Sequence, residues 1–301
     1  MSLTTQDRFR GALLGLACGD AVGTTVEFSP RGSFMPLRDM IGGGPFRLEA
    51  GQWTDDTSMA LCLGASLLKT GFDPKDQMNR YCDWYINGYM SSTGRCFDIG
   101  TTVRDSLDDY ESSGDPFSGP THPHSAGNGC IMRLAPVPMY FFPDRKEAIR
   151  MASESSRTTH GTAECLESCK LLSAILCETF AGSPKESVMT PPDFEPLGCA
   201  KVAAISRGEW KAKLKPEIRG SGYVVECLEA ALWCFDQTDS FENAILTAAN
   251  LGDDADTTAA VCGQIAGAFY GESGIPAHWL QKLAKVDEIR EMADSLGAAN
   301  A

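Results

Sequence analysis

Apolar residues recur at helical spacing along most of this chain, and that pattern restricts it to folds built from packed helices. Residues 6–19 place Phe9, Leu13 and Leu16 on one stripe, as an amphipathic helix requires. Almost no segment shows the period-two alternation between hairpin turns that marks half-exposed strands. The sequence therefore predicts an all-α fold.

Local signals mark where several helices begin and end. Thr4 and Asp7 have the spacing of a capping box. Residues 55–70 are typical of a buried helix stopped by Gly71, and Asp73-Pro74 is a typical start for the next. Further helices are predicted at 102–111, 128–141, 145–157, 162–181, 223–236, 240–250, 255–270 and 276–297. The Gly-, Pro- and Ser-rich stretches 28–52, 113–127 and 183–222 are expected to be connections within one domain, residues 1–301.

The composition excludes several classes of protein. A net charge of −14 makes nucleic acid an unlikely partner and argues against anionic membranes, although a local basic pocket for a phosphate stays open. The chain starts without a basic segment followed by an apolar run, and no apolar run reaches the length of a membrane span. The twelve cysteines include no C-x-x-C pair. A reduced, cytoplasmic protein without a disulfide scaffold is the expected class.

Two short acidic clusters lie about two hundred residues apart. They are Thr54-Asp55-Asp56-Thr57 and Asp253-Asp254-Ala255-Asp256-Thr257-Thr258, and each runs into an apolar helical stretch. Carboxylates and hydroxyls together are the oxygen ligands that hard divalent cations such as Mg²⁺ prefer. If the fold brings the clusters together, they would form a two-metal site from both ends of the chain.

Helix capping is the alternative for both clusters. With 40 acidic residues in 301, chance alone gives roughly five adjacent acidic pairs, and Asp108-Asp109 is one. Thr and Asp are also preferred at helix starts. However, each cluster holds more carboxylates than one helix start uses, and extra negative charge beside apolar helices is costly without a cation. Asp254 and Asp256, two residues apart, would also converge at the entry of a helix.

Other metal and nucleotide patterns fit poorly. None of the histidines lies in H-E-x-x-H, so zinc ligation has little support; they are His122, His124, His160 and His278. There is no Walker P-loop or G-x-S-x-G elbow. An isoprenoid synthase would also be helical with two acidic motifs, but its first motif, Asp-Asp-x-x-Asp, lacks its last Asp in residues 55–59.

Four motifs occur in order along the chain: Gly15-Leu16-Ala17-Cys18-Gly19-Asp20-Ala21-Val22-Gly23 followed by Glu27, Trp53-Thr54-Asp55-Asp56-Thr57, Gly127-Asn128-Gly129-Cys130-Ile131-Met132-Arg133, and Gly252-Asp253-Asp254-Ala255-Asp256-Thr257-Thr258. Together they resemble the ADP-ribosylglycohydrolase family, and most closely the dinitrogenase reductase-activating glycohydrolases. The resemblance covers roughly residues 8–285. It implies a compact single-domain orthogonal helical bundle with two Mg²⁺ or Mn²⁺ ions at the bottom of an ADP-ribose cleft.

The resemblance also implies roles for the acidic residues. Asp98 matches an acidic position near the reacting ribose, and Glu27 matches one near the metals and the scissile bond, with a surface carboxylate as the alternative for Glu27. Asp98, Glu27 and Asp55 are the expected catalytic residues. Asp253 stands where many relatives have Gly and is expected to be an outer neighbour. The implied metal ligands are Thr54, Asp55, Asp56, Asp254, Asp256 and Thr257.

The same resemblance implies where ADP-ribose would bind. Gly100 and Thr101 would offer donors to the diphosphate at a helix N-terminus. The loop around Gly127 would wrap the ligand, since glycine lets the backbone approach closely; an ordinary turn is the alternative. A structural role is the alternative for His160, which would lie near the phosphates, and for Tyr223, which would stack on adenine. The expected binding residues are Gly100, Thr101, Ser125, Gly127, Asn128, Gly129, Met132, His160 and Tyr223.

The implied activity is hydrolysis of the bond between C1″ of ADP-ribose and a protein side chain, most plausibly arginine. An ADP-ribosylated protein would be the substrate and ADP-ribose the product, with the enzyme acting as a monomer. Asp98, or less favourably Glu27, would be the general base. Serine-, O-acetyl- or nucleic-acid-linked ADP-ribose, a catalytically silent ADP-ribose-binding protein and an isoprenoid synthase stay open as alternatives.

Overall fold

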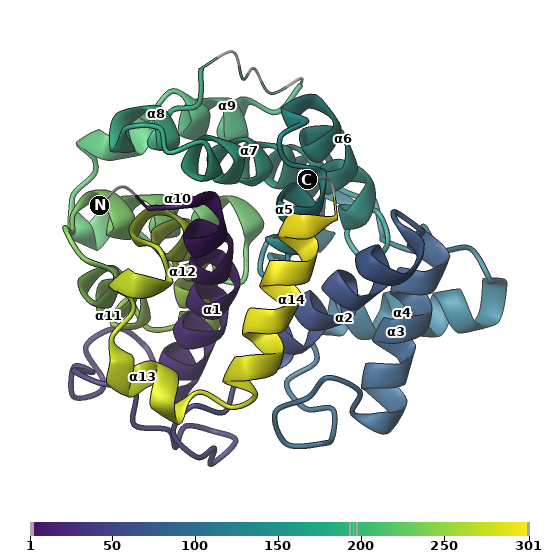
Figure 1. The fold of residues 1–301 in the computed structure, drawn as a ribbon, viewed down its shortest axis with the longest axis horizontal. Helices are drawn as coiled ribbons and strands as arrows, with labels where there is room; N and C mark the ends of the chain where they lie inside the picture. The colour runs from purple at the N-terminus through teal and green to yellow at the C-terminus, as the bar shows by residue number, and fades with distance from the viewer. Residues whose placement is uncertain (1–2, 193, 195, 197, 300–301) are drawn as a thin grey trace.

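The computed structural model describes residues 3–299 apart from 193, 195 and 197, and within them the chain is helical (Figure 1). The described residues form fourteen α-helices, and no strands beyond two isolated bridges. The all-α prediction is confirmed. The helices are α1 (Thr5–Gly23), α2 (Asp55–Thr70), α3 (Pro74–Asn87), α4 (Thr101–Ser113), α5 (Pro136–Phe141), α6 (Arg145–Ser156), α7 (Ala163–Phe180), α8 (Lys185–Met189), α9 (Ala200–Ser206), α10 (Val224–Asp236), α11 (Phe241–Ala249), α12 (Ala255–Tyr270), α13 (Ala277–Lys282) and α14 (Val286–Ala298).

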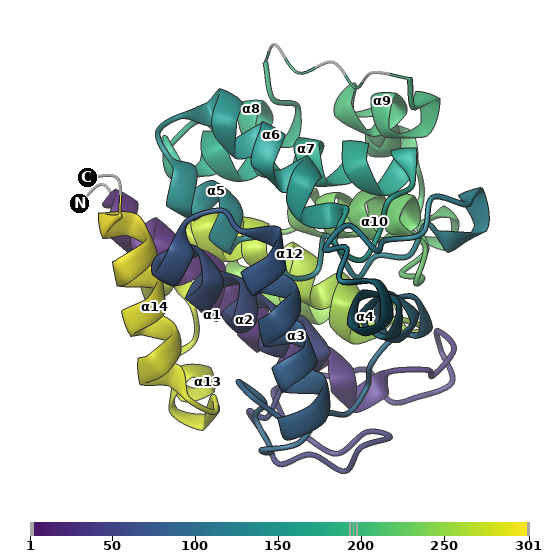
Figure 2. The same ribbon diagram turned by 90° about the vertical axis from the view of Figure 1, so that its right-hand side faces the viewer.

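The helices α1 and α12 lie side by side at the centre, with α6 to α9 grouped above them (Figures 1 and 2). Their contact depends on glycine residues, which have no side chain. A Cβ atom added to Gly15 would lie 2.3 Å from the carbonyl oxygen of Gly263, and one added to Gly267 would lie 1.9 Å from that of Gly11. Because only glycine permits such close backbones, this seam fixes the distance between the two helices.

The seam runs antiparallel and joins the end of α1 to the start of α12. Gly11 faces Gly267 at one end of the contact, and Gly23 faces Asp256 at the other. Beyond the helices, the Phe28 amide donates to the Asp253 carbonyl at 2.7 Å and the Asp253 amide donates to the Ser29 carbonyl at 2.8 Å. The first residues after α1 are therefore held against the second acidic cluster.

Several helix bounds differ from the sequence prediction. The predicted helix 128–141 is helical only from Pro136, because residues 128–134 form consecutive turns after Gly127. The predicted helix 276–297 is divided into α13 and α14 at Lys285, whose φ of 53° is left-handed. The stretch 183–222, predicted to be irregular, contains α8 and α9. These short helices lack the length at which periodicity is distinctive.

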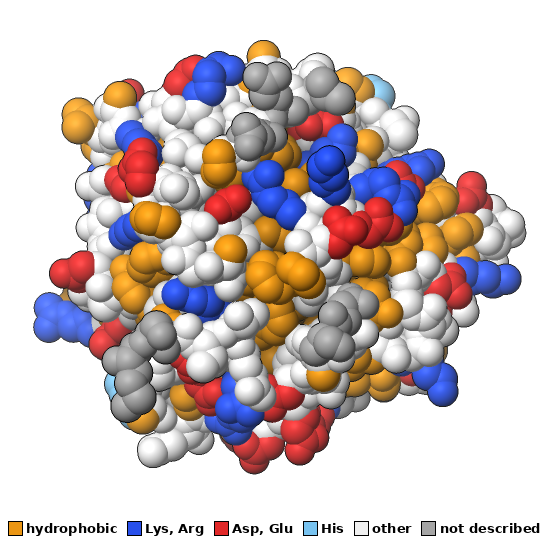
Figure 3. Space-filling view, turned by 45° about the horizontal axis from the view of Figure 1, so that its top comes forward, with side chains coloured by type: hydrophobic (Ala, Val, Ile, Leu, Met, Phe, Trp, Pro, Cys, Tyr) orange, Lys and Arg blue, Asp and Glu red, His pale blue; other side chains and the backbone are white. Residues whose placement is uncertain are grey.

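The cysteines, the length of the helices and the charges on one face bear on the expected class of protein. All twelve cysteines are described and free, and all but Cys96 are buried. Among the described helices, none combines the length and apolar character needed to cross a membrane. On the face in Figure 3, acidic and basic side chains are interspersed, with hydrophobic side chains between them. That face therefore carries no large area of a single charge.

Candidate functional site

The two acidic clusters meet at the N-terminal ends of α2 and α12. The Thr54 hydroxyl donates to the Asp256 carboxylate at 3.4 Å, and the Thr257 hydroxyl donates to the Asp56 carboxylate at 3.4 Å. All four side chains are buried. The central seam explains this meeting, since it presses the start of α12 against the end of α1.

The clusters do not act as helix caps. Thr54 precedes α2 and Asp254 precedes α12, yet neither side chain makes a capping hydrogen bond. Instead, one carboxylate oxygen of Asp56 and one of Asp256 are buried without any partner in the described structure. A buried carboxylate oxygen without a partner is costly, and an oxygen-only set of such donors fits a hard divalent cation.

Two further carboxylates from other parts of the chain join the site. Single carboxylate oxygens of Glu27, Asp98 and Asp256 lie within 4.8 Å of one another. Glu27 is only 6 % exposed and has an unpartnered oxygen, which excludes the alternative of a surface carboxylate. Asp98 takes a left-handed backbone conformation with φ of 61°. That conformation is costly for a residue other than glycine and is often found at functional sites.

Burial dominates the electrostatics of the cluster. It raises the pKa of Asp55, Asp56 and Asp256 well above the ordinary range, and neighbouring carboxylates raise it further. The same causes raise the pKa of Glu27 to about 8 and that of Asp98 to about 11. Without a cation the cluster therefore retains protons, because so many carboxylates cannot all ionise in one buried place.

Asp20 is a site residue that the sequence reasoning missed. Its fully buried carboxylate accepts from the amide and hydroxyl of Thr54 at 2.8 and 2.9 Å, and from those of Thr57 at 3.0 and 2.6 Å. Four donors thus fix the start of α2 to the end of α1. Its position within the first family motif was the only sequence signal, and that motif does not reveal which residues Asp20 contacts.

A cleft of about 350 Å³ opens above the carboxylates. Of the predicted residues, those that line it are Glu27, Asp55, Asp98, Gly100, Thr101, Gly127, Asn128, Gly129, Met132, His160, Asp254, Asp256 and Thr257. Thr54 and Asp56 lie buried outside its lining. Ser125 and Tyr223 line a second cavity of about 590 Å³ that shares Thr102, Gly127 and Gly222 with the cleft. The two cavities adjoin along residues 125–129, which we call the glycine loop.

His160 supports the glycine loop from beneath. It is 2 % exposed, and a Cβ atom on Gly129 would lie 2.8 Å from its ring. Its Nδ1 is 2.9 Å from the Thr159 hydroxyl, and burial lowers the pKa of His160 to about 4. Position 129 therefore has to be glycine, because any side chain would clash with the neutral imidazole behind it. The same glycine leaves the backbone open toward the cleft.

Further contacts hold Asn128 and Tyr223 in place. The Asn128 amide donates to the Asp254 carboxylate at 2.9 Å, which ties the loop to the second acidic cluster. In the second cavity, the Lys201 ammonium donates to the Tyr223 hydroxyl at 2.7 Å and forms an ion pair with Glu164 at 3.0 Å. Tyr223 is thereby held in place at the start of α10.

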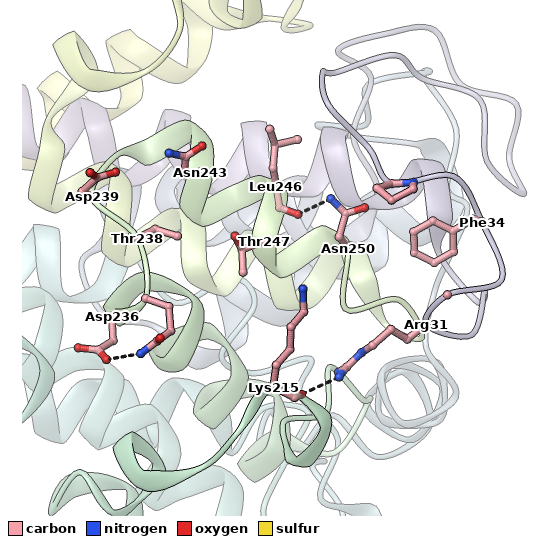
Figure 4. Close-up of a pocket in the computed structure, with 13 residues that line it drawn as sticks. Arg31, Phe34, Lys215, Asp236, Thr238, Asp239, Asn243, Leu246, Thr247 and Asn250 are labelled. Atoms are coloured by element: carbon pink, nitrogen blue, oxygen red, sulfur yellow. Dashed lines mark hydrogen bonds between the residues drawn. The ribbon is translucent and has the colours of Figure 1, made fainter.

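A larger cavity of about 730 Å³ lies elsewhere, between residues 31–36 and α11 (Figure 4). Its lining includes none of the clustered carboxylates. The guanidinium of Arg31 there donates to the carbonyls of Leu251, Lys215 and Ile218, so it ties loops together. The smaller cleft, with its converging acidic groups, is the better candidate for chemistry.

The model of the ADP-ribosylglycohydrolase family matches residues 1–301. The chain belongs to the ADP-ribosylglycohydrolase family. Its cleft, lined by acidic residues from both ends of the chain, is therefore the candidate active site of a family member.

Three relatives illustrate the similarity. The ADP-ribosylarginine hydrolase Tri1 of Serratia proteamaculans is 47% identical, covering 96% of this chain and 79% of that protein. The ADP-ribosyl-[dinitrogen reductase] glycohydrolase of Rhodospirillum rubrum is 32% identical, covering 97% and 96%. A solved structure described as an ADP-ribosylglycohydrolase-related protein complex has a TM-score of 0.86 and 41% identity, with 99% of each chain covered. The predicted likeness to the dinitrogen reductase enzymes is confirmed, but the arginine hydrolase is more similar to this chain, at 47% against 32% identity.

Proposed function

We propose that this protein is a divalent-metal-dependent hydrolase that releases ADP-ribose from modified arginine side chains of proteins. The observation that carries the proposal is the carboxylate cluster with unpartnered buried oxygens at the edge of the cleft. The ADP-ribosylarginine hydrolase from Serratia proteamaculans, at 47% identity, supports arginine as the linkage.

The residues fit two Mg²⁺ or Mn²⁺ ions. The ligands would be Thr54, Asp55, Asp56, Asp254, Asp256 and Thr257, which offer oxygen atoms alone, as these cations prefer. The unpartnered oxygens of Asp56 and Asp256 support this role. Bound ions would orient the ribose hydroxyls and make a nearby water more acidic.

The remaining polar residues would bind and orient ADP-ribose. Gly100 and Thr101 stand at the start of α4, where free backbone amides favour a diphosphate. The glycine loop would follow the ligand toward the second cavity. There the ring of Tyr223, held by Lys201, would stack on adenine.

In the reaction, the C1″–nitrogen bond breaks and its electron pair stays with the guanidine. Positive charge develops on the ribose, and the surrounding carboxylates stabilise it. A water oxygen bonds to C1″ and gives its proton to Asp98 as general base, with Glu27 as the alternative base. The proton then passes to the guanidine, so that the unmodified arginine side chain of the protein and ADP-ribose are the products.

A panel of substrates tests the proposal. Proteins carrying arginine- or serine-linked ADP-ribose, O-acetyl-ADP-ribose and ADP-ribosylated nucleic acid would be incubated with the protein and Mg²⁺, Mn²⁺ or EDTA, and free ADP-ribose measured. We expect metal-dependent release from the arginine-linked substrate, and loss of that release in Asp256→Asn. Glu291→Gln, an exposed acid-to-amide change on α14, is the matched control and should behave as the wild type.

Other results would contradict it. Release that persists in EDTA would refute the metal requirement. Release from another linkage alone would replace arginine with that leaving group. ADP-ribose binding without release from any substrate would instead indicate a binding protein.

A further inference from the structure

Phe28 is an exposed aromatic residue at the rim of the cleft. It follows Glu27 directly, lines the cleft and is 66 % exposed. Its backbone is left-handed, with φ of 60°, a conformation that is strained for a bulky residue. A hydrophobic ring held in water at such a cost does little for the core. The rim position therefore suggests that the ring meets a ligand.

Asp253 lies beside Phe28 and is also left-handed, with φ of 57°. Two backbone hydrogen bonds join residues 28 and 29 to Asp253. The Asp253 side chain is exposed and makes no hydrogen bond or ion pair with the described residues. Glycine adopts this conformation without strain, so the backbone does not require a carboxylate here. The second acidic cluster thus contains one carboxylate that the buried site does not use.

Phe28 lines the cleft together with Glu27 but does not line the second cavity. That cavity, which carries Ser125 and Tyr223, includes neither Phe28 nor Glu27 in its lining. If ADP-ribose extends from the carboxylates toward Tyr223, Phe28 remains on the side where the leaving group departs. Phe28 contacts Phe46 at a ring separation of 6.4 Å, and Phe46 contacts Phe97 at 5.3 Å. These rings support Phe28 from one side.

We infer that Phe28 and Asp253 form a recognition pair for the guanidinium leaving group, an inference that rests on the proposed function. An arginine that carries ADP-ribose on one nitrogen keeps a planar, positively charged guanidinium. An aromatic face attracts such a cation, and a carboxylate accepts hydrogen bonds from it. Phe28 lines the cleft, and backbone hydrogen bonds hold Asp253 beside residues 28 and 29, just outside that lining.

The test separates leaving-group binding from ADP-ribose binding. KM and kcat would be measured on an arginine-ADP-ribosylated peptide, and the dissociation constant of free ADP-ribose, which has no leaving group, by calorimetry. Phe28→Leu keeps an apolar side chain but loses the aromatic face, and Phe28→Tyr restores it. Asp253→Asn removes the charge with a residue that also tolerates the left-handed conformation. Met35→Leu and Glu291→Gln, at exposed positions outside the lining of the cleft and of the second cavity, are the controls.

We expect Phe28→Leu and Asp253→Asn each to raise KM about three- to tenfold, with the affinity for ADP-ribose unchanged. Phe28→Tyr and both controls should match the wild type. The KM of the wild type should also rise with salt, and that of Asp253→Asn should rise less. Unchanged KM values, or an equal loss of ADP-ribose affinity, would overturn the recognition pair while leaving the proposed function intact. A wild type that releases nothing from the arginine-linked peptide would overturn both.

Discussion

The close contact between α1 and α12 makes Gly15→Ala a sensitive test of the fold. The added methyl carbon would lie 2.3 Å from the Gly263 carbonyl oxygen, whereas ordinary contacts begin at 3.4 Å. The helices would therefore have to separate by about 1 Å. Neither side of this contact is a flexible side chain, so the strain cannot be relieved by a change of rotamer.

The magnitude follows from two opposing effects. Overpacking in a core costs about 1–3 kcal/mol, and a backbone clash belongs at the upper end of that range. Replacing a helical glycine with alanine returns about 1 kcal/mol through helix propensity. We expect a net loss of about 2 kcal/mol in the free energy of unfolding, or about 4 °C in Tm. Because a shift of about 1 Å also separates Glu27 from Asp256, ADP-ribose release should fall by up to about 100-fold.

Thermal and urea unfolding, followed by circular dichroism, would measure the change. Gly64→Ala is the matched control, since Gly64 is also helical and its close neighbour is the flexible thioether of Met292, at 2.5 Å. That variant should be as stable as the wild type or slightly more stable. If Gly15→Ala were as stable and active as Gly64→Ala, the seam would not fix the distance between the acidic clusters.

Three further predictions concern the site. Asp56→Asn should abolish both ADP-ribose release and the increase in Tm that Mn²⁺ causes. It should not lower the Tm measured without metal, because it removes a buried carboxylate whose pKa is raised. A Tm that still increases with Mn²⁺ would contradict this. Asp20→Asn should lose about 3 kcal/mol of stability and weaken Mn²⁺ binding measured by calorimetry; unchanged binding would refute its role in placing Thr54. His160, with a pKa of about 4 in the fold and about 6.5 when unfolded, contributes stability that is present above pH 6.5 and is lost as the pH falls toward 4. This loss, about 3 kcal/mol, should be absent in His160→Gln when unfolding free energies are compared across that range.

Much of the helical architecture could be predicted, because helical periodicity and caps are local. The Thr4 side chain accepts a hydrogen bond from the Asp7 amide at 3.1 Å, which is one half of the predicted capping box, while the Asp7 carboxylate accepts from Ser273. Residues 128–134 were predicted incorrectly because a glycine loop with apolar residues imitates a helix until its turns are known. The four glycines at every fourth position of α1 were a visible signal of close packing that periodicity of apolar residues does not include.

The candidate site also has features that the sequence predicts and features that depend on tertiary contacts. The chemical type of the clusters could be read from the sequence, since oxygen ligands limit the cations that bind. That Glu27 is buried, and that Asp20 holds Thr54 and Thr57, depends on contacts between separate segments. The same holds for the position of Asp253 beside residues 28 and 29, which depends on hydrogen bonds between segments far apart in the sequence.

By itself, the sequence determined an all-helical chain of the ADP-ribosylglycohydrolase family with two oxygen-rich clusters, because helix formation and ligand chemistry are written in neighbouring residues. Only the tertiary structure decided that the clusters meet, which of their oxygens lack partners, and which carboxylate stays exposed. The physical reason is the seam between α1 and α12. There, glycines without side chains set the distance between the two helices and so bring together residues more than two hundred positions apart.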